Sequence, residues 1–235
     1  MINEQHSRTA ALVGEEALER LSRARVAVFG VGGVGGHLAE ALARAGVGAI
    51  DLVDGDVVSV SNINRQIIAL HSTVGRPKVE VMAERIRDIN PACKVTAHHR
   101  LYLPENADEL DLSVYDYVAD AIDTVSAKLE LCVRAKALNV PIIAAMGAGN
   151  KLDPSAFEVS DIAKTTVCPL ARVMRTELRR RGINHLKVVY SRELPVTTGT
   201  TDEEGRRRTV PASISFVPSA AGLLMAGEIV QDLIS

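Results

Sequence analysis

The chain of 235 residues is 47% hydrophobic and 24% charged, with a formal net charge of −2, which predicts one globular domain with a sizeable core. No apolar run approaches the roughly 20 residues of a membrane-spanning helix, and the N-terminal sequence lacks the basic and apolar regions of a secretory signal. Cys93, Cys132 and Cys168 form no CxxC pair and no even-numbered framework, so we expect a cytoplasmic protein without structural zinc.

Strand and helix patterns alternate along the first 150 residues. Apolar or alternating runs of strand length predict strands at 26–29, 50–53, 94–98, 115–122 and 141–146. Apolar residues at helical spacing, followed by stop signals, predict helices at 35–45, 77–90 and 126–138. Strands separated by helices require crossover connections, so we expect an α/β fold with a Rossmann-like, doubly wound and mainly parallel sheet.

Residues 151–235 give weaker patterns and are interpreted as a C-terminal elaboration of that sheet. Helices are predicted at 170–181 and 219–233, a strand at 186–190, and a polar, mobile loop at 196–208. No change in composition marks a second domain, so the single domain is expected to span 1–235.

A glycine-rich turn, GVGGVG at 30–35, directly follows the first predicted strand. Glycine allows a tight turn and a close approach to phosphate, and the N-terminus of the next helix offers free N–H groups and a partial positive charge. Asp54 ends the second strand, where a carboxylate can accept hydrogen bonds from ribose hydroxyls. A glycine turn without a ligand is the structural alternative. The sequence predicts a nucleotide site that includes Gly30, Gly32, Gly33, Gly35 and Asp54.

Polar residues beyond Asp54 argue for chemistry on the phosphates. A redox dinucleotide needs only the helix N-terminus for its pyrophosphate, whereas cleavage of a triphosphate needs cations near the developing charge. Arg65 offers a fork of donors, Lys78 a point charge, and Asn62 an amide that can orient a phosphate or a metal-bound water. Asp123 ends a strand at the same edge of the predicted sheet and suits Mg²⁺. Each residue alone has an ordinary structural explanation, and their joint presence indicates ATP cleavage.

With these motifs the chain resembles the ThiF/MoeB superfamily of adenylating enzymes, which are related to ubiquitin-activating enzymes. The resemblance implies that Asp54 holds the ribose of ATP, that Asn62, Arg65 and Lys78 contact the phosphates, and that Asp123 serves Mg²⁺. The motifs that carry it are GVGGVG at 30–35, DGD at 54–56, SNINRQ at 61–66, GRPK at 75–78 and Asp123.

Further expectations about the site follow from the same resemblance. Asp56 and Gln66 lie inside these motifs and are expected to line the ATP site. The superfamily also implies a homodimer in which an N-terminal arginine reaches the partner's ATP, and Arg8, in the imperfectly matching HSRT at 6–9, takes that position. The nucleotide-binding part is then expected at about 20–150, and the part facing the substrate and the dimer at about 151–235.

Within the superfamily the chain is similar to the tRNA threonylcarbamoyladenosine dehydratase group through most of its length. This implies an ATP-dependent, ligase-type enzyme that dehydrates N6-threonylcarbamoyladenosine in tRNA through adenylation of its carboxylate. The group also implies tRNA as substrate and allows for a sulfur-transfer partner such as a cysteine desulfurase. The similar segments are 64–70, 86–91, 120–124, 146–150 and 161–165.

Three other functions remain open from the sequence. The first is an adenylyltransferase that activates the C-terminus of a small ubiquitin-like sulfur-carrier protein, although the missing CxxC pairs separate this chain from zinc-bearing relatives of that kind. The second is an NAD-linked oxidoreductase, which leaves the residues at 62–65 unexplained. The third is a nucleotide-binding module without catalysis.

The segment 164–208 carries eleven Lys or Arg residues and only five acidic ones. Such an asymmetry indicates either a polyanion partner or a solvated, arginine-rich helix face. With 3% aromatic residues and no Trp, contact with an RNA backbone is more plausible than base stacking. Candidate phosphate contacts are Arg172, Arg175, Arg179 and 206–208. Cys168 precedes a predicted helix, and an ordinary half-buried thiol is favoured there over a persulfide or thioester role.

Overall fold

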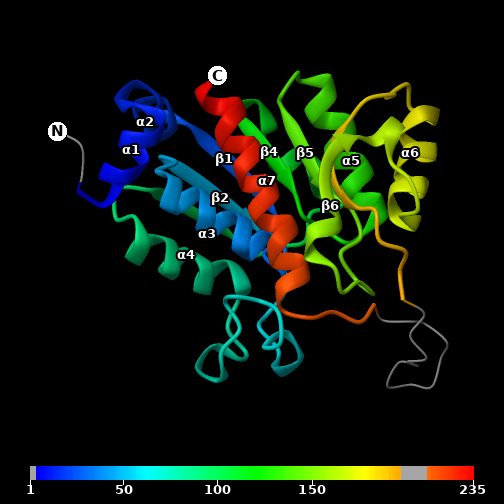
Figure 1. The fold of residues 1–235 in the computed structure, drawn as a ribbon, viewed down its shortest axis with the longest axis horizontal. Helices are drawn as coiled ribbons and strands as arrows, with labels where there is room; N and C mark the ends of the chain where they lie inside the picture. Colours follow the sequence, from blue (N-terminus) through cyan, green and yellow to red (C-terminus); the bar gives the residue numbers. More distant parts are fainter. Residues whose placement is uncertain (1–3, 197–210) are drawn as a thin grey trace.

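The structure, a computed structural model, describes residues 4–196 and 211–235, and its centre is a seven-stranded sheet. The strand order is β3-β2-β1-β4-β5-β7-β6 (Figure 1). All neighbouring strands are parallel except β6 and β7, which are antiparallel. The strands are β1 (Arg25–Phe29), β2 (Ala49–Val53), β3 (Lys94–His98), β4 (Tyr117–Asp120), β5 (Ile142–Ala145), β6 (Phe157–Asp161) and β7 (Lys187–Ser191).

Helices cover both faces of this sheet (Figure 1). One apolar core lies under α3, α4 and α7, and a second lies under α5 and α6. The helices α1 and α2 precede β1, and α2 packs against α7. The helices are α1 (Ser7–Val13), α2 (Glu15–Arg23), α3 (Gly35–Ala45), α4 (Lys78–Ile89), α5 (Val125–Ala137), α6 (Pro169–Arg180) and α7 (Phe216–Ile234). Short 3-10 helices occur at Glu4–His6, Val60–Asn62, His71–Thr73, Pro104–Glu109, Leu112–Val114, Pro154–Ala156 and Ile162–Lys164.

The predicted doubly wound, mainly parallel sheet is therefore confirmed, but several details of the prediction were wrong. The sequence did not predict α1, α2 or the edge strand β6, which within residues 4–196 and 211–235 pairs with β7 alone. The predicted strand at 115–122 is shorter, as β4 spans Tyr117–Asp120. The closing helix begins at Phe216, because Pro218 occupies the first helical turn, where its missing N–H is not needed. The loop predicted at 196–208 lies almost wholly outside the described residues.

The last helix, α7, is 19 residues long and has a mean hydropathy of 1.2, so by length and composition alone it meets the criterion for a membrane span. In the fold it is a packed helix that lies on α3 and the sheet. Its Asp232 accepts a hydrogen bond from Tyr117 on β4 at 2.7 Å and pairs with Lys187 on β7. Its buried side chains belong to the apolar core, which accounts for its apolar composition.

Strand register places the carboxyl ends of the central strands beside one another. Phe29 at the end of β1 lies opposite Val53 of β2 and Asp120 of β4. The segments that follow these three residues consequently emerge at one edge of the sheet. A binding site in a doubly wound sheet is expected at this edge, where the connections diverge to opposite faces.

Candidate nucleotide-binding site

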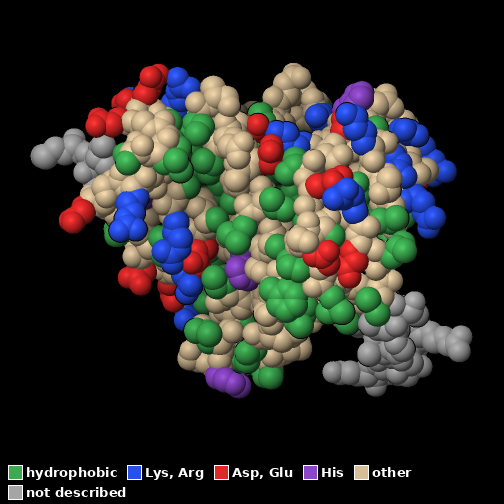
Figure 2. Space-filling view, in the orientation of Figure 1, with side chains coloured by type: hydrophobic (Ala, Val, Ile, Leu, Met, Phe, Trp, Pro, Cys, Tyr) green, Lys and Arg blue, Asp and Glu red, His purple; other side chains and the backbone are tan. Residues whose placement is uncertain are grey.

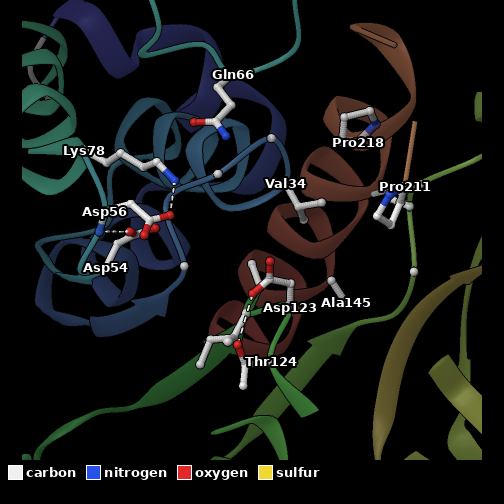
Figure 3. A pocket seen from close by; sticks show the side chains of 18 of the residues that line it. Val34, Asp54, Asp56, Gln66, Lys78, Asp123, Thr124, Ala145, Pro211 and Pro218 are labelled. Carbon is white, nitrogen blue, oxygen red and sulfur yellow. Dashed lines mark hydrogen bonds and ion pairs between the residues drawn. The ribbon is translucent and has the colours of Figure 1, made fainter. Parts of the chain in front are cut away.

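A cavity of about 660 Å³ opens at the carboxyl edge of the sheet. Its lining comes from segments far apart in the sequence, including the glycine loop, the residues after β2 and β4, and the end of β5. The predicted site residues that line it are Gly30, Gly32, Gly33, Asp54, Asp56, Arg65, Gln66, Lys78 and Asp123. Figure 3 shows Lys78, Asp54 and Asp56 together on one side of the cavity, and Asp123 with Thr124 on another.

The glycine loop is shaped by close backbone contacts. Gly30 has a φ of +86°, which favours glycine, and a Cβ there would lie 2.6 Å from the carbonyl oxygen of Ala121. Gly35 begins α3 and does not line the cavity, but a Cβ there would lie 1.8 Å from the carbonyl oxygen of Gly30. These two glycines therefore let the turn, the helix and the β4 segment approach one another.

Asp54 is tied to the glycine loop by its own carboxylate. One oxygen accepts a hydrogen bond from the Val31 N–H at 2.7 Å, and the other accepts from the Asp56 N–H at 2.8 Å. A carboxylate has about four acceptor positions, so both oxygens keep capacity for a ribose hydroxyl. The carboxylate thus orders the glycine loop and remains able to bind a sugar.

Lys78 and Asp56 meet because two short segments pair. Val57 and Pro77 form an antiparallel bridge, and the Lys78 N–H donates to the Asp56 carbonyl oxygen at 3.0 Å. The side chains then form an ion pair, with Lys78 Nζ 2.6 Å from Asp56 Oδ2. Lys78 is buried on α4, whereas the Asp56 carboxylate is 61% exposed. The ammonium is thereby held at the cavity with two of its three N–H donors left for a phosphate.

Arg65 lies in the turn after Asn62 and reaches the cavity. Its Nη1 donates to the Ser61 carbonyl oxygen at 2.9 Å and to Asn64 Oδ1 at 2.8 Å. Asn62 itself is buried, and its Oδ1 accepts from the Ser59 N–H at 3.1 Å, so it organises the turn that presents Arg65. Gln66 is buried too, and its Oε1 has no hydrogen-bond partner among the described residues. Its amide nitrogen Nε2 lies beside the glycine loop, 3.7 Å from where a Cβ on Gly32 would be.

Asp123 follows β4 and is exposed at the cavity, where Thr124 Oγ1 lies 3.4 Å from its Oδ1. The described residues contain no cluster of three His, Cys, Asp or Glu side chains that would hold a metal on its own. Mg²⁺, however, is ordinarily bound by one or two carboxylates together with substrate phosphates and water. A single exposed carboxylate that lines the same cavity as Lys78 and Arg65 fits that mode of binding.

Arg8 lies away from the cavity. It is exposed on α1, and the neighbouring His6 packs beside Gly46, at the C-terminal end of α3. The cavity lies at the N-terminal end of the same helix. Arg8 therefore does not join the site within one copy of the chain.

Several lining residues escaped the sequence reasoning. The segment after β3 contributes four consecutive residues, the segment before α7 contributes two, and α7 itself contributes Pro218. Asn64 Nδ2 donates to the Ser213 carbonyl oxygen at 3.0 Å, which fastens the second of these segments over the cavity. The glycines of MGAGN at 146–150 were a detectable signal, since they follow β5 at the same sheet edge. The missed residues include Arg100, Leu101, Tyr102, Leu103, Thr124, Met146, Gly147, Gly149, Pro211, Ser213 and Pro218.

The three cysteines are buried and free. Burial raises the pKa of the Cys93 thiol to about 11 and raises the pKa of Cys132 further, so both behave as core residues. Cys168 precedes α6 and lies near Gly147, with its Sγ 3.8 Å from where a Cβ on that glycine would be. A half-buried thiol was expected there, and the side chain is fully buried.

The chain is similar to known proteins over nearly its whole length. The tRNA threonylcarbamoyladenosine dehydratase of Bacillus subtilis is 45% identical over 98% of this chain and 94% of its own length. The crystal structure of the Escherichia coli tRNA N6-threonylcarbamoyladenosine dehydratase, TcdA, in complex with AMP superposes with a TM-score of 0.90 at 36% identity, covering 100% of this chain and 97% of the other. The same enzyme has also been solved in complex with ATP, with a TM-score of 0.88.

A maize adenylyltransferase and sulfurtransferase, MOCS3-2, is also similar, at 39% identity over 58% of this chain and 28% of its own length. The family model for the ThiF family matches residues 6–235. The chain belongs to the ThiF family.

Proposed function

We propose that this chain is an ATP-dependent tRNA threonylcarbamoyladenosine dehydratase that works through adenylation of a carboxylate. The observation that carries the proposal is the convergence of the glycine loop, Asp54, Arg65, Lys78 and Asp123 on one cavity. Relatives of that name match nearly the whole chain, and one of them binds ATP and AMP. The single-domain division, with nucleotide binding at 20–150 and substrate binding at 151–235, is part of the proposal.

The reaction follows from the charges at the cavity. The threonyl carboxylate of the modified adenosine attacks the α-phosphorus of ATP, giving an acyl adenylate and pyrophosphate. Arg65 and Lys78 stabilise the negative charge that develops on the leaving group, and Asn62 keeps the turn that carries Arg65 in place. The neighbouring carbamoyl group then attacks the activated carbonyl, AMP leaves, and a ring closes with net loss of water. No protein nucleophile is required.

Asp123 is the residue proposed to hold Mg²⁺ together with the phosphates. Bound there, the ion supplies positive charge to the phosphate oxygens. Asp54 orients the ribose and keeps the α-phosphate next to the glycine loop. Gly30, Gly32, Gly33 and Gln66 form the floor beneath the phosphates.

We further propose a homodimer, in which Arg8 contributes to the partner's site. The position of Arg8 at the far end of α3 supports this, because the side chain has no route to its own cavity. The test is a mixing experiment. An Arg8→Ala chain combined with an inactive Lys78→Met chain should regain activity, since a mixed dimer holds one intact site.

For tRNA, the exposed face of α6 is the proposed docking surface. Figure 2 shows Lys and Arg side chains gathered over this helix. Leu170 in its first turn lines the cavity, so the helix leads away from the site. Arg172 and Arg179 are exposed on it, about 10 Å apart by helical rise. Arg175 is different, because its Nη1 donates to the Thr165 carbonyl oxygen at 2.9 Å and so supports the loop instead.

The decisive experiment uses purified protein, ATP, Mg²⁺ and tRNA that carries threonylcarbamoyladenosine. Nucleoside mass spectrometry is expected to show conversion to a product lighter by one water, and Lys78→Met protein should leave the nucleoside unchanged. An unchanged nucleoside with wild-type protein would refute the proposal. Exchange of pyrophosphate into ATP that depends on a sulfur-carrier protein, and not on tRNA, would favour the carrier adenylyltransferase, which the maize relative represents.

A further inference from the structure

A buried ion pair lies directly beneath the segment that carries Asp123. Lys128 on α5 places its Nζ 2.9 Å from Oδ2 of Asp120, the last residue of β4. Both side chains are 0% exposed. Asp120 and Lys128 do not line the cavity, and the proposed reaction does not use them.

The pair joins three elements at the edge of the sheet. Asp120 Oδ1 accepts a hydrogen bond from the Ile122 N–H at 3.1 Å, so its carboxylate folds under the residue that precedes Asp123. Lys128 Nζ donates to the carbonyl oxygen of Ala145 at 2.8 Å, at the end of β5. The ammonium thus links the end of β4 to the end of β5.

The segment above the pair is fixed from a second direction as well. The Ala121 N–H donates to the Phe29 carbonyl oxygen at 2.8 Å, and the missing Cβ of Gly30 lets the Ala121 carbonyl approach the glycine loop. The side chain of Thr124 makes no capping hydrogen bond to α5. These contacts tie the segment to β1 and the glycine loop, whereas the ion pair ties it to the end of β5.

Stability alone is a poor explanation for this arrangement. Two charges removed from water lose several kcal/mol of hydration each, and apolar side chains of similar size are often as stable or more so. Burial accordingly raises the pKa of Asp120, although the Lys128 ammonium acts to lower it. An apolar pair would pack the same space without holding the Ile122 N–H and the Ala145 carbonyl.

We propose that Asp120 and Lys128 are positioning residues that set the place of Asp123, and through it the affinity of the site for Mg²⁺ bound with ATP. The inference rests on the proposed role of Asp123 as a Mg²⁺ ligand. It assigns no contact between the pair and the nucleotide.

The test measures ATP binding by calorimetry as the Mg²⁺ concentration is varied, without tRNA. Lys128→Met is expected to raise the Mg²⁺ concentration for half-maximal ATP affinity by about 10- to 100-fold, the range typical of residues that orient metal ligands. ATP binding in EDTA should be unchanged. Asp123→Asn should have a similar effect, and adding Lys128→Met to it should change nothing further, because the pair acts through Asp123.

A second variant separates positioning from stability. Asp120→Asn/Lys128→Met removes both charges, so its melting temperature should recover toward wild type while its Mg²⁺ requirement stays high. Lys187→Met is the control, since it removes an ion pair with Asp232 at the opposite edge of the sheet and should leave the Mg²⁺ requirement unchanged.

An unchanged Mg²⁺ requirement in Lys128→Met and in Asp120→Asn/Lys128→Met would overturn the inference. The inference would also be overturned if the effects of Lys128→Met and Asp123→Asn on the Mg²⁺ requirement were additive. A normal Mg²⁺ requirement in Asp123→Asn would overturn it too. Because this experiment contains no tRNA, failure of the dehydratase proposal would appear separately, as wild-type protein that binds ATP and Mg²⁺ but leaves the nucleoside unmodified.

Discussion

Replacing Gly35 by alanine should disable the nucleotide site while most of the fold survives. The new Cβ would lie 1.8 Å from the Gly30 carbonyl oxygen, whereas contacts of this kind are not found below about 3.0 Å. The glycine loop or the start of α3 must therefore move by more than about 1 Å. A misplacement of that size in a binding or catalytic group can lower activity by about 100-fold. Overpacking should also reduce the free energy of unfolding by about 1–3 kcal/mol.

Gly227→Ala is the matched control. Gly227 also lies in a helix, α7, but a Cβ there meets no atom within 4 Å. Alanine should stabilise this helix by about 1 kcal/mol and leave ATP binding unchanged. Calorimetric titration with ATP and thermal unfolding of both variants provide the comparison. Wild-type affinity for ATP in Gly35→Ala would show that the close approach of the loop to α3 is not what builds the site.

Three further predictions concern charge. Lys78→Met should lower the rate of ATP-dependent turnover by about 100- to 1,000-fold. The melting temperature should change little, because the partner carboxylate of Asp56 is mostly exposed. A variant with normal turnover would show that Lys78 takes no part in the mechanism. Asp51 is buried among Arg25 and other donors. Burial acts to raise the pKa of its carboxyl, but the hydrogen bonds outweigh burial and lower the pKa. The carboxylate therefore stabilises the fold above about pH 4, and this stabilisation disappears as the pH falls through the lowered pKa. Asp51→Asn should therefore be less stable at pH 7 by about 2–3 kcal/mol, with denaturant midpoints that converge with wild type below pH 4; a constant difference would contradict this. Arg172→Ala/Arg179→Ala should raise the KM for tRNA and flatten its dependence on salt by about one unit of slope for each arginine, with ATP binding intact, and equal salt slopes would argue against α6 as the docking surface.

The parts of the site that follow from local sequence were predictable. The turn at 30–35 and the strands around it place Asp54 and Asp123 at the carboxyl edge of a parallel sheet, because register aligns the strand ends. The likeness of residues 61–66 and 75–78 to adenylating enzymes identified Arg65 and Lys78 as cavity residues. What the sequence did not reveal was the Lys78–Asp56 ion pair, which depends on the bridge between Val57 and Pro77.

Features formed by distant segments could not be read from local patterns. The edge strand β6 forms through its pairing with β7 and its packing against α7, and its own residues alternate weakly. The segment 211–213 is held at the cavity by hydrogen bonds to the side chains of Asn64 and Asn150, which lie far away in the sequence. Lys128 looks like an ordinary helix residue until the fold brings Asp120 and the end of β5 around it.

We propose above that this cavity activates the threonyl carboxylate of the modified nucleoside at the α-phosphorus of ATP. The direct measurement uses tRNA whose threonyl carboxylate is labelled with ¹⁸O, incubated with the protein, ATP and Mg²⁺. Adenylation predicts that one labelled oxygen is transferred to AMP as the ring closes. Release of unlabelled AMP, or of ADP with labelled phosphate, would contradict the account.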